Sequence, residues 1–255
     1  MDIIRLDSRK TETLLDNLLP VTVFREIDST NTYAKQALTD GRTPPFLVIA
    51  EKQTAGRGRR GHSFFSPDSG LYYTLTVRPD NEAEALVRTT IAAAAAVHKA
   101  ILECTGIQTG IKWVNDLYLN RKKVCGILCE APRRRDGSLA GIVIGIGINC
   151  STSEFPEELK DIAGSLNRPD LDRNILAASI TKHLVSYLDD LKNPEILDIY
   201  RSASILIGRP VSFIRDGAEI HGTAADINDN GELVVTTERG TEILSSGEIS
   251  LTSWE

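Results

Sequence analysis

The chain has 255 residues, of which 41% are hydrophobic and 25% charged, and its formal net charge is −6. These proportions fit a globular protein and exclude a disordered chain, and no apolar run reaches the roughly 18 residues that a membrane-spanning helix needs. The acidic balance opposes non-specific binding to nucleic acid, so any binding of phosphate has to come from a local basic cluster.

The start of the chain and its cysteines indicate a compartment. Residues 1–20 lack the basic start and apolar stretch of a signal peptide, and four cysteines are too few for a disulfide scaffold. We therefore predict a cytoplasmic protein with reduced thiols.

The first predicted helix follows Asp28–Asn31, a cluster of typical N-cap residues. Helix formers continue to Leu38, and Gly41 predicts the end of the helix. The apolar run Phe46–Ala50 predicts a buried strand, and the stretch Gln53–Ser69, rich in Gly, Arg and Ser, predicts a loop.

A strand and a long helix are predicted after this loop. Leu71–Val77 alternates and is rich in β-forming residues, which predicts the strand. Asn81 and Glu84 have the spacing of a capping box, and the helix that they open should extend to about Glu103 and end near Gly106.

The middle of the chain predicts an antiparallel meander. Its predicted strands are Ile111–Trp113, Leu117–Leu119, Val124–Glu130 and Leu139–Ile148. Asp136-Gly137 before the last strand is a typical hairpin turn. Two helices, over Asn174–Leu191 and Glu195–Ser204, are predicted to follow.

The predicted elements change from helices to short strands at Gly208-Arg209-Pro210. Short alternating strands follow, separated by four turn pairs: Asp216-Gly217, Asn230-Gly231, Arg239-Gly240 and Ser246-Gly247. Regular strands and glycine turns over so short a length predict a small closed β-barrel. We therefore divide the chain into one domain over residues 1–207 and a small barrel over residues 208–255.

The strongest local feature is the segment Gly56–Gly61, which has three glycines and three arginines in six positions. Glycine lets the backbone approach a ligand closely, and the arginine guanidinium group is a fixed fork of donors for phosphate or carboxylate. The segment predicts a mobile clamp over a small anion. A solvated basic loop and an RNA-binding patch are the alternatives.

The strand within Ala140–Cys150 has two different faces, because side chains alternate along a strand. One face carries Ile142, Ile144, Ile146 and Ile148, and the other carries Gly141, Val143, Gly145, Gly147 and Asn149. The isoleucine face predicts part of the core. The glycine face predicts either a flat ligand on the sheet or a tightly packed helix, such as the alanine-rich helix around Ala92–Ala96, and the pattern leaves both open.

Two cations, an amide and a carboxylate gather around one predicted hairpin, at Lys112, Asn115, Asp116 and Lys123. A turn with ordinary surface charges is the alternative. Lys123 directly precedes the apolar strand that begins at Val124, which predicts a side-chain stem against the core and an ammonium group near the sheet face.

A second polar group combines Ser29, Thr30 and Asn31 at the first helix start with Gln53 before the arginine segment. These side chains could hydrogen-bond the polar, uncharged head of a ligand. Helix capping is the alternative for the first three.

Four motifs, in this order and spacing, together resemble the biotin–protein ligases: GRGRRG at Gly56–Gly61, KWVNDL at Lys112–Leu117, Lys123-x-x-Gly126, and GIGIN at Gly145–Asn149. The resemblance covers the chain from about residue 21 to the C-terminus. It implies an α+β fold with a mixed or antiparallel sheet and flanking helices, of the class II synthetase-like type. A small C-terminal SH3-like β-barrel is implied as well.

The resemblance implies an ATP-dependent, AMP-forming enzyme, a biotin–[acetyl-CoA-carboxylase] ligase. Biotin and ATP would give biotinyl-5′-AMP and pyrophosphate, with Mg²⁺ shielding the triphosphate. The biotin would then pass to a lysine of a biotin carboxyl carrier domain. A lipoate–protein ligase and a biotin-sensing transcriptional regulator are alternatives.

The regulator is disfavoured because about 20 residues precede the catalytic region, too few for a helix-turn-helix domain. We therefore expect neither DNA nor a membrane as a partner. Related ligases pair through sheet edges, so the resemblance also allows a homodimer.

The resemblance implies roles for individual residues. The implied biotin contacts are Ser29, Thr30, Asn31, Gln53, Gly56, Arg57, Gly58, Arg59, Lys123, Gly126 and Gly145. The implied ATP contacts are Arg59, Arg60, Phe64, Lys112, Asn115, Asp116, Lys123 and Asn149. The implied catalytic residues are Lys123, Arg57, Arg59 and Asp116, and Asp116 is also the expected Mg²⁺ ligand.

Two residues depart from the family pattern. Val114 stands where many members have proline, which predicts a looser kink before Asn115. Phe64 stands where a tryptophan often stacks on adenine, which predicts weaker nucleotide binding because a phenyl ring offers less area.

Overall fold

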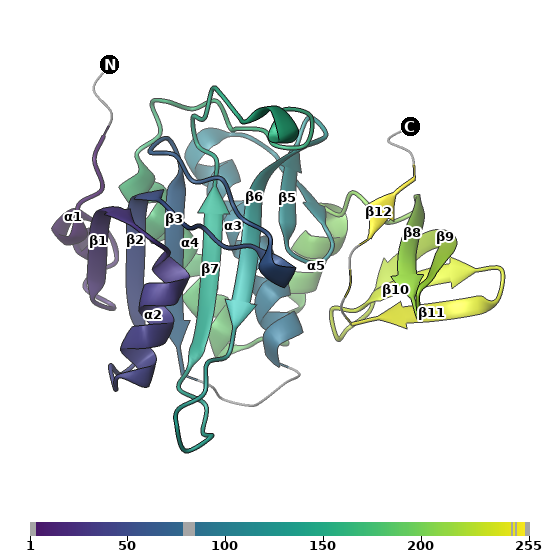
Figure 1. Cartoon of the computed structure of the whole chain (residues 1–255), viewed down its shortest axis with the longest axis horizontal. Coiled ribbons are helices and arrows are strands. Elements are labelled where there is room, and N and C mark those ends of the chain that lie inside the picture. The colour runs from purple at the N-terminus through teal and green to yellow at the C-terminus, as the bar shows by residue number, and fades with distance from the viewer. Residues whose placement is uncertain (1–3, 79–84, 246, 248, 253–255) are drawn as a thin grey trace.

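The computed structural model describes residues 4–78, 85–245, 247 and 249–252, and it has a large sheet with helices on both faces and a smaller sheet beside it (Figure 1). The helices are α1 (Ser8–Leu14), α2 (Thr30–Thr39), α3 (Ala85–Thr105), α4 (Arg173–Asp189) and α5 (Pro194–Ser202). The strands of the large sheet are β1 (Val21–Ile27), β2 (Phe46–Gln53), β3 (Leu71–Val77), β4 (Gly110–Lys112), β5 (Asp116–Leu119), β6 (Lys122–Glu130) and β7 (Ile142–Ile148). Those of the small sheet are β8 (Pro210–Arg215), β9 (Ala218–Ile227), β10 (Leu233–Thr237), β11 (Gly240–Leu244) and β12 (Ser250–Leu251).

The large sheet has the strand order β1-β2-β3-β7-β6-β5-β4. β1 and β2 are parallel, and every other neighbouring pair is antiparallel. The predictions of a mixed sheet and of a central meander are therefore confirmed. β7 lies between β3 and β6, so Gly145 is opposite Thr74 on one side and Leu128 on the other.

Helix α2 has the predicted boundaries because local residue chemistry sets both ends. At its start, the side chain of the N-cap residue Ser29 accepts a hydrogen bond from N of Thr32 at 3.4 Å. At its end, Gly41 has a φ of 101°, in the left-handed region that favours glycine. The cap residues that sequence identifies are thus the residues that end this helix.

Of two other predicted elements, one differs in length. β2 continues three residues beyond the predicted strand, because its pairing with β1 extends to Gln53. Asn81 and Glu84, the predicted capping box, lie outside the described residues. α3 ends at Thr105, directly before Gly106, as predicted.

The two faces of β7 are covered differently. Its four isoleucines pack into the main core with the alanine run of α3, so the interpretation that placed this helix on the glycine face is wrong. Helix α2 covers the first part of the glycine face, where Leu38 and Val143 belong to a second, smaller core. The part at Gly145 and Gly147 lines a cavity instead.

The small sheet has the strand order β11-β10-β9-β8-β12, with antiparallel neighbours throughout, which confirms a separate C-terminal β-domain. Nε1 of Trp113, between β4 and β5, donates to O of Gly231 in the β9–β10 turn at 2.9 Å and so joins the two domains. The boundary at residue 207 stays a prediction. Within the described ranges, none of the helices combines the length and apolarity that crossing a membrane requires.

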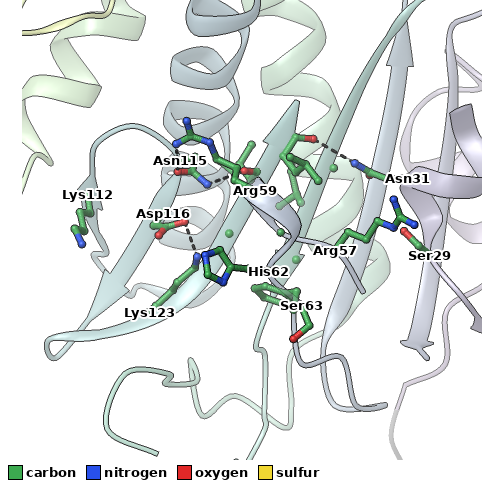
Figure 2. A pocket seen from close by; sticks show the side chains of 18 of the residues that line it. Ser29, Asn31, Arg57, Arg59, His62, Ser63, Lys112, Asn115, Asp116 and Lys123 are labelled. Atoms are coloured by element: carbon green, nitrogen blue, oxygen red, sulfur yellow. Dashed lines mark hydrogen bonds and ion pairs between the residues drawn. The ribbon is translucent and has the colours of Figure 1, made fainter. Parts of the chain in front are cut away.

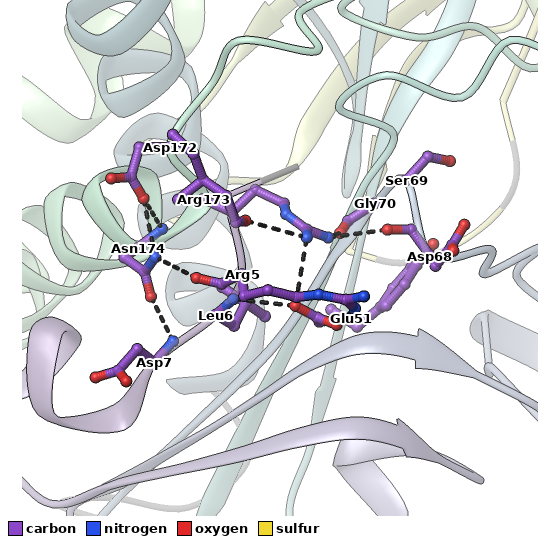
Figure 3. Close-up of polar contacts among 12 residues, drawn as sticks. Arg5, Leu6, Asp7, Glu51, Asp68, Ser69, Gly70, Asp172, Arg173 and Asn174 are labelled. Carbon is purple, nitrogen blue, oxygen red and sulfur yellow. Dashed lines mark hydrogen bonds and ion pairs between the residues drawn. The ribbon is translucent and has the colours of Figure 1, made fainter. Parts of the chain in front are cut away.

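A buried ion pair between Arg173 and Glu51 fixes the two ends of the loop between β2 and β3 (Figure 3). Arg173 of α4, which is 4% exposed, donates to the carbonyl oxygens of Asp68 at 3.0 Å and Gly70 at 2.7 Å. Its Nη2 lies 3.6 Å from Oε1 of Glu51, near the end of β2. Glu51 also accepts a hydrogen bond from N of Leu6 at 3.0 Å, so the N-terminal segment closes the cluster.

Candidate active site

A cavity of about 300 Å³ opens over the uncovered part of the glycine face. Its walls come from the start of α2, the β2–β3 loop, the segment from β4 to β6, and the C-terminal domain. Figure 2 shows the polar side chains that surround it. The lining includes most of the predicted residues: Ser29, Thr30, Asn31, Gln53, Arg57, Gly58, Arg59, Phe64, Lys112, Asn115, Asp116, Lys123, Gly126 and Gly145.

Three glycines let other side chains lie directly on the sheet. A Cβ added at Gly145 would be 2.1 Å from Oδ1 of Asn31, and one at Gly147 would be 2.6 Å from the ring of Phe64. A Cβ at Gly126 would be 3.1 Å from Cε of Lys123. The bare face therefore forms the base of the cavity, and the lining side chains rest on it.

The start of α2 forms one end of the cavity. N of Thr30 donates to Oε1 of Gln53 at 2.9 Å, and Nε2 of Gln53 donates to Oγ of Ser66 at 3.2 Å. Ser29, Thr30 and Asn31 are 2%, 3% and 5% exposed. This end offers hydrogen-bonding groups on buried, uncharged side chains, which suits the polar but uncharged head of a ligand.

The glycine-arginine segment folds as a tight hairpin. N of Gly58 donates to O of His62 at 2.8 Å, and N of Phe64 donates to O of Gly56 at 3.0 Å. Gly56 is needed for this close approach, because a Cβ there would lie 2.4 Å from Oγ of Ser66. The hairpin carries its arginines across the cavity.

The two arginines predicted to be catalytic lie on opposite sides of the cavity. Nη1 of Arg59 donates to Oδ1 of Asn115 at 3.1 Å and lies 3.5 Å from O of Gly247. Figure 2 shows the guanidinium group of Arg57 on the side of Ser29. The segment therefore places a positive group near each end of the cavity.

The β5–β6 hairpin supplies the remaining charges. Nζ of Lys123 and Oδ1 of Asp116 form an ion pair of 2.7 Å, and their side chains are 33% and 20% exposed. Nδ2 of Asn115 donates to O of Ile127 at 2.8 Å, which fixes its other amide atom toward the arginine hairpin. Lys112 also lines the cavity. Cations thus outnumber carboxylates at this end, which favours binding of phosphate.

The phenol and thiol groups beside this hairpin do not ionise at neutral pH. Burial, with a smaller contribution from the charge of Asp116, raises the pKa of Tyr118 to about 12. Burial also raises the pKa of Cys125 far above its usual range. The chemistry of the site therefore depends on fixed charges and backbone rather than on a cysteine nucleophile.

Three predicted residues do not line the cavity: Gly56, Arg60 and Asn149. Arg60 is at the tip of the hairpin with a φ of 52°. Asn149 is 4% exposed, and its Nδ2 donates to O of Gly164 at 2.8 Å. Their ligand contacts stay predictions.

Sequence reasoning missed two groups of lining residues. The first group lies within or beside the recognised motifs and strands, where proximity could have found them: His62, Ser63, Tyr73, Trp113, Ile127, Leu128 and Ile146. Gly147, which also lines the cavity, is on the predicted glycine face. The second group, Gly247, Ile249 and Ser250, comes from the C-terminal domain, and no pattern in the sequence connects it to the site.

Comparisons with known proteins agree with this geometry. The biotin/lipoate A/B protein ligase family matches residues 23–149, and the biotin protein ligase C terminal domain matches residues 206–252. The chain is 34% identical over 253 residues to the bifunctional ligase/repressor BirA of Bacillus subtilis, covering 95% of this chain and 76% of that protein. It is 30% identical over 234 residues to the biotin–[acetyl-CoA-carboxylase] ligase of Paracoccus denitrificans, covering 87% of this chain and 96% of that protein.

A solved structure has the same fold. The biotin protein ligase from Aquifex aeolicus in complex with biotin and ATP superposes with a TM-score of 0.76 at 28% identity. The match covers 91% of this chain and 97% of that one.

Proposed function

The chain belongs to the biotin/lipoate A/B protein ligase family and acts as a biotin protein ligase, and we propose that it does so in two steps within this cavity. First, a carboxylate oxygen of biotin attacks the α-phosphorus of ATP, which forms biotinyl-5′-AMP and releases pyrophosphate. Then the amine of a lysine on a biotin carboxyl carrier domain attacks the acyl carbon. The amide forms, the amine loses a proton, and AMP leaves.

The ring of biotin is assigned to the start of α2. Thr30 and Gln53 offer buried hydrogen-bonding groups there, and a ring with a cyclic urea is polar but uncharged. Asn31 lies over Gly145, so its side-chain amide covers the strand at this point and forms the surface beneath the ring. The acid group of biotin then extends toward Lys123, at the opposite end of the cavity.

Lys123 is assigned the main catalytic role. Negative charge develops on the phosphate oxygens in the first step and on the acyl oxygen in the second, and a positioned cation stabilises both transition states. Arg59, which contacts Asn115, adds positive charge at the same end, and Arg57 adds it from the side of Ser29. Asp116 holds the ammonium group of Lys123 over the hairpin. Its second assigned role is to orient the lysine amine of the carrier domain.

The nucleotide is assigned to the cationic end of the cavity. Its contacts would come from Arg60, Phe64, Lys112, Asn115 and Asn149, together with the three cations that act on the phosphates. A Cβ added at Gly147 would be 2.6 Å from the ring of Phe64, so this ring lies directly over the glycine face, where it would stack on adenine.

Mg²⁺ is assigned a place beside the nucleotide rather than a site of its own. In the described residues no group of three or more His, Cys, Asp or Glu could hold a metal ion. Mg²⁺ in nucleotide sites needs only one or two carboxylates, with phosphates and water as its other ligands, and Asp116 supplies one. When bound with ATP, the ion would shield the triphosphate.

The single observation that carries this proposal is the meeting of Lys123, the arginine hairpin and the start of α2 around one bare strand surface. The test incubates the protein with biotin, ATP, Mg²⁺ and a carrier domain, and measures the mass of the carrier. We expect one added biotinyl group, lost when ATP is omitted or when the acceptor lysine is replaced by arginine. Modification by lipoate in preference to biotin, or no modification, would refute the proposal. A homodimer and a cytoplasmic location stay predictions.

A further inference from the structure

A tyrosine of α5 holds the kink between β4 and β5 from within the core. Oη of Tyr200 donates to O of Val114 at 3.0 Å, and the two residues are 0% and 5% exposed. Tyr200 belongs to the main core rather than to the lining of the cavity, whereas Asn115 and Asp116, which directly follow Val114, line the cavity. The hydroxyl of Tyr200 thus holds the peptide group that precedes two residues of the site.

The direction of this hydrogen bond is settled by the chemistry of its two groups. A carbonyl oxygen can only accept, so Tyr200 has to be the donor. Burial, with a smaller contribution from the charge of Asp116, raises the pKa of Tyr200 well above its ordinary value, so the hydroxyl keeps its hydrogen. Because Val114 is almost inaccessible to water, removal of the hydroxyl would leave a buried acceptor without a partner.

The end of α5 is itself a fixed support. N of Ile111 in β4 donates to O of Ala203, directly after the helix, at 2.7 Å, and N of Ile205 donates to O of Ile111 at 2.9 Å. Nε of Arg201 donates to O of Ile227, at the end of β9, at 2.8 Å. The tyrosine hydroxyl therefore belongs to a segment that is tied both to the large sheet and to the C-terminal domain.

The two residues after Val114 contact the catalytic cations. Oδ1 of Asn115 accepts a hydrogen bond from Nη1 of Arg59 at 3.1 Å, and Oδ1 of Asp116 forms the ion pair of 2.7 Å with Nζ of Lys123. A turn of the peptide group between Val114 and Asn115 would rotate the backbone at Asn115. Both contacts would then be displaced.

A second support holds the same segment from β6. O of Ile127 accepts from Nδ2 of Asn115, and N of Ile127 donates to O of Asn115, each at 2.8 Å. These two bonds remain without Tyr200, so the segment should stay folded when the hydroxyl is removed. They do not reach the carbonyl of Val114, which also lacks the ring by which proline restrains the backbone. Loss of the hydroxyl is therefore expected to misplace the side chains of the kink rather than to unfold it.

We propose that Tyr200 is a positioning residue for adenylate formation, because its hydroxyl fixes the kink at Val114 and thereby the places of Arg59 and Lys123. This inference rests on the proposed function. Tyr200 acts through the two residues after the kink and touches no reacting atom. The end of the cavity that we assign to biotin is built from α2 and β2, so it does not depend on α5.

The test replaces Tyr200 by phenylalanine, which keeps the ring in the core and removes only the hydroxyl. We expect the kcat for biotinyl-AMP formation, measured by release of pyrophosphate, to fall about five- to tenfold, the effect of one lost hydrogen bond on a positioned group. The KM for biotin should stay within about twofold. Amide hydrogen exchange over residues 113–117 should become faster, because the kink has lost a restraint.

Thr76→Val is the matched control. The hydroxyl of Thr76 is equally buried and also donates to a backbone carbonyl, O of Phe46 at 3.1 Å, but it lies between β2 and β3. It accepts a hydrogen bond from N of Phe46 as well, so this variant should lose at least as much stability in urea as Tyr200→Phe. Its kcat and its hydrogen exchange over residues 113–117 should match the wild type.

Three results would overturn the proposal. The first is a wild-type kcat in Tyr200→Phe, and the second is an equal fall of kcat in Thr76→Val. The third is a rise in the KM for biotin as large as the fall in kcat, which would show a general loss of structure. Failure of the wild-type protein to form biotinyl-AMP from biotin and ATP would instead refute the proposed function.

Discussion

Replacing Gly145 by alanine would place a methyl carbon 2.1 Å from Oδ1 and 2.6 Å from Nδ2 of Asn31. Real Cβ atoms do not approach other atoms so closely, and the backbone of β7 is fixed by pairing on both sides. The side chain of Asn31 is therefore the part that has to move. It would be displaced outward, into the space that we assign to the ring of biotin.

The cost follows from the contacts that Asn31 would lose. One is its hydrogen bond to the carboxylate of Glu130 and the other is its hydrogen bond with Thr74. A hydrogen bond to a charged group contributes about 1.5–3 kcal/mol and a neutral one about 0.5–1.5 kcal/mol, so the folded protein should lose about 2–4.5 kcal/mol. For a chain of this size, that corresponds to a fall in Tm of roughly 4–18 °C.

Isothermal titration with biotin and thermal unfolding of the free protein together test this reasoning. We expect Gly145→Ala to bind biotin at least about tenfold more weakly, which corresponds to losing about 1.4 kcal/mol of binding free energy. Gly147→Ala is the contrasting variant, because its methyl group meets Phe64 and should weaken ATP binding more than biotin binding. A Gly145→Ala protein with wild-type Tm and wild-type affinity for biotin would show that Asn31 does not lie on the strand.

Three further predictions concern charge. Lys123→Ala should slow biotinyl-AMP formation roughly 10²–10³-fold, the usual loss for one charge-stabilising donor, and near-normal release of pyrophosphate would remove Lys123 from the mechanism. Arg173→Ala should lower the free energy of unfolding in urea by about 3 kcal/mol, the lower end of the cost of breaking a buried pair, because Glu51 loses its buried partner and keeps only the exposed Arg5, whereas Arg168→Ala on the surface should unfold close to the wild-type midpoint. Burial lowers the pKa of His98 below its ordinary value of 6.5. As the pH falls below 6.5, His98 therefore binds a proton in the unfolded chain before it does so in the folded chain, and the free energy of unfolding decreases. Urea unfolding at several pH values should show a smaller acid loss in His98→Gln than in wild type, and identical pH profiles would contradict this.

Much of the fold follows from patterns that are local in sequence. The N-cap chemistry at Ser29 fixes the start of α2, and the alternation along β7 separates a core face from a glycine face. Each pattern depends on residues only a few positions apart, which is the range over which backbone geometry relates one side chain to the next. Sequence reasoning therefore identifies elements and faces reliably here.

What covers each face depends on contacts between distant segments, and the sequence did not determine it. The isoleucine and glycine faces could each have received the alanine-rich helix, and only the packing shows that it covers the isoleucines. The contact of Arg59 with Asn115 and with Gly247 joins three segments from both domains. No periodicity in the chain encodes such a meeting, although the residue types at positions 59 and 115 pointed to binding chemistry.

Thr74 and Thr76 show how the register of a sheet separates two residues that the sequence pattern treats alike. Thr76 is opposite Val143, and its hydroxyl hydrogen-bonds the backbone of the neighbouring strand. Thr74 is opposite Gly145, and the missing side chain there leaves the room in which Asn31 reaches the hydroxyl. Glycine within a strand destabilises a protein by roughly 0.5–1 kcal/mol relative to alanine, so its presence at this position is explained by the use of the space above it. One glycine in β7 thus connects a buried threonine on the next strand to the cavity.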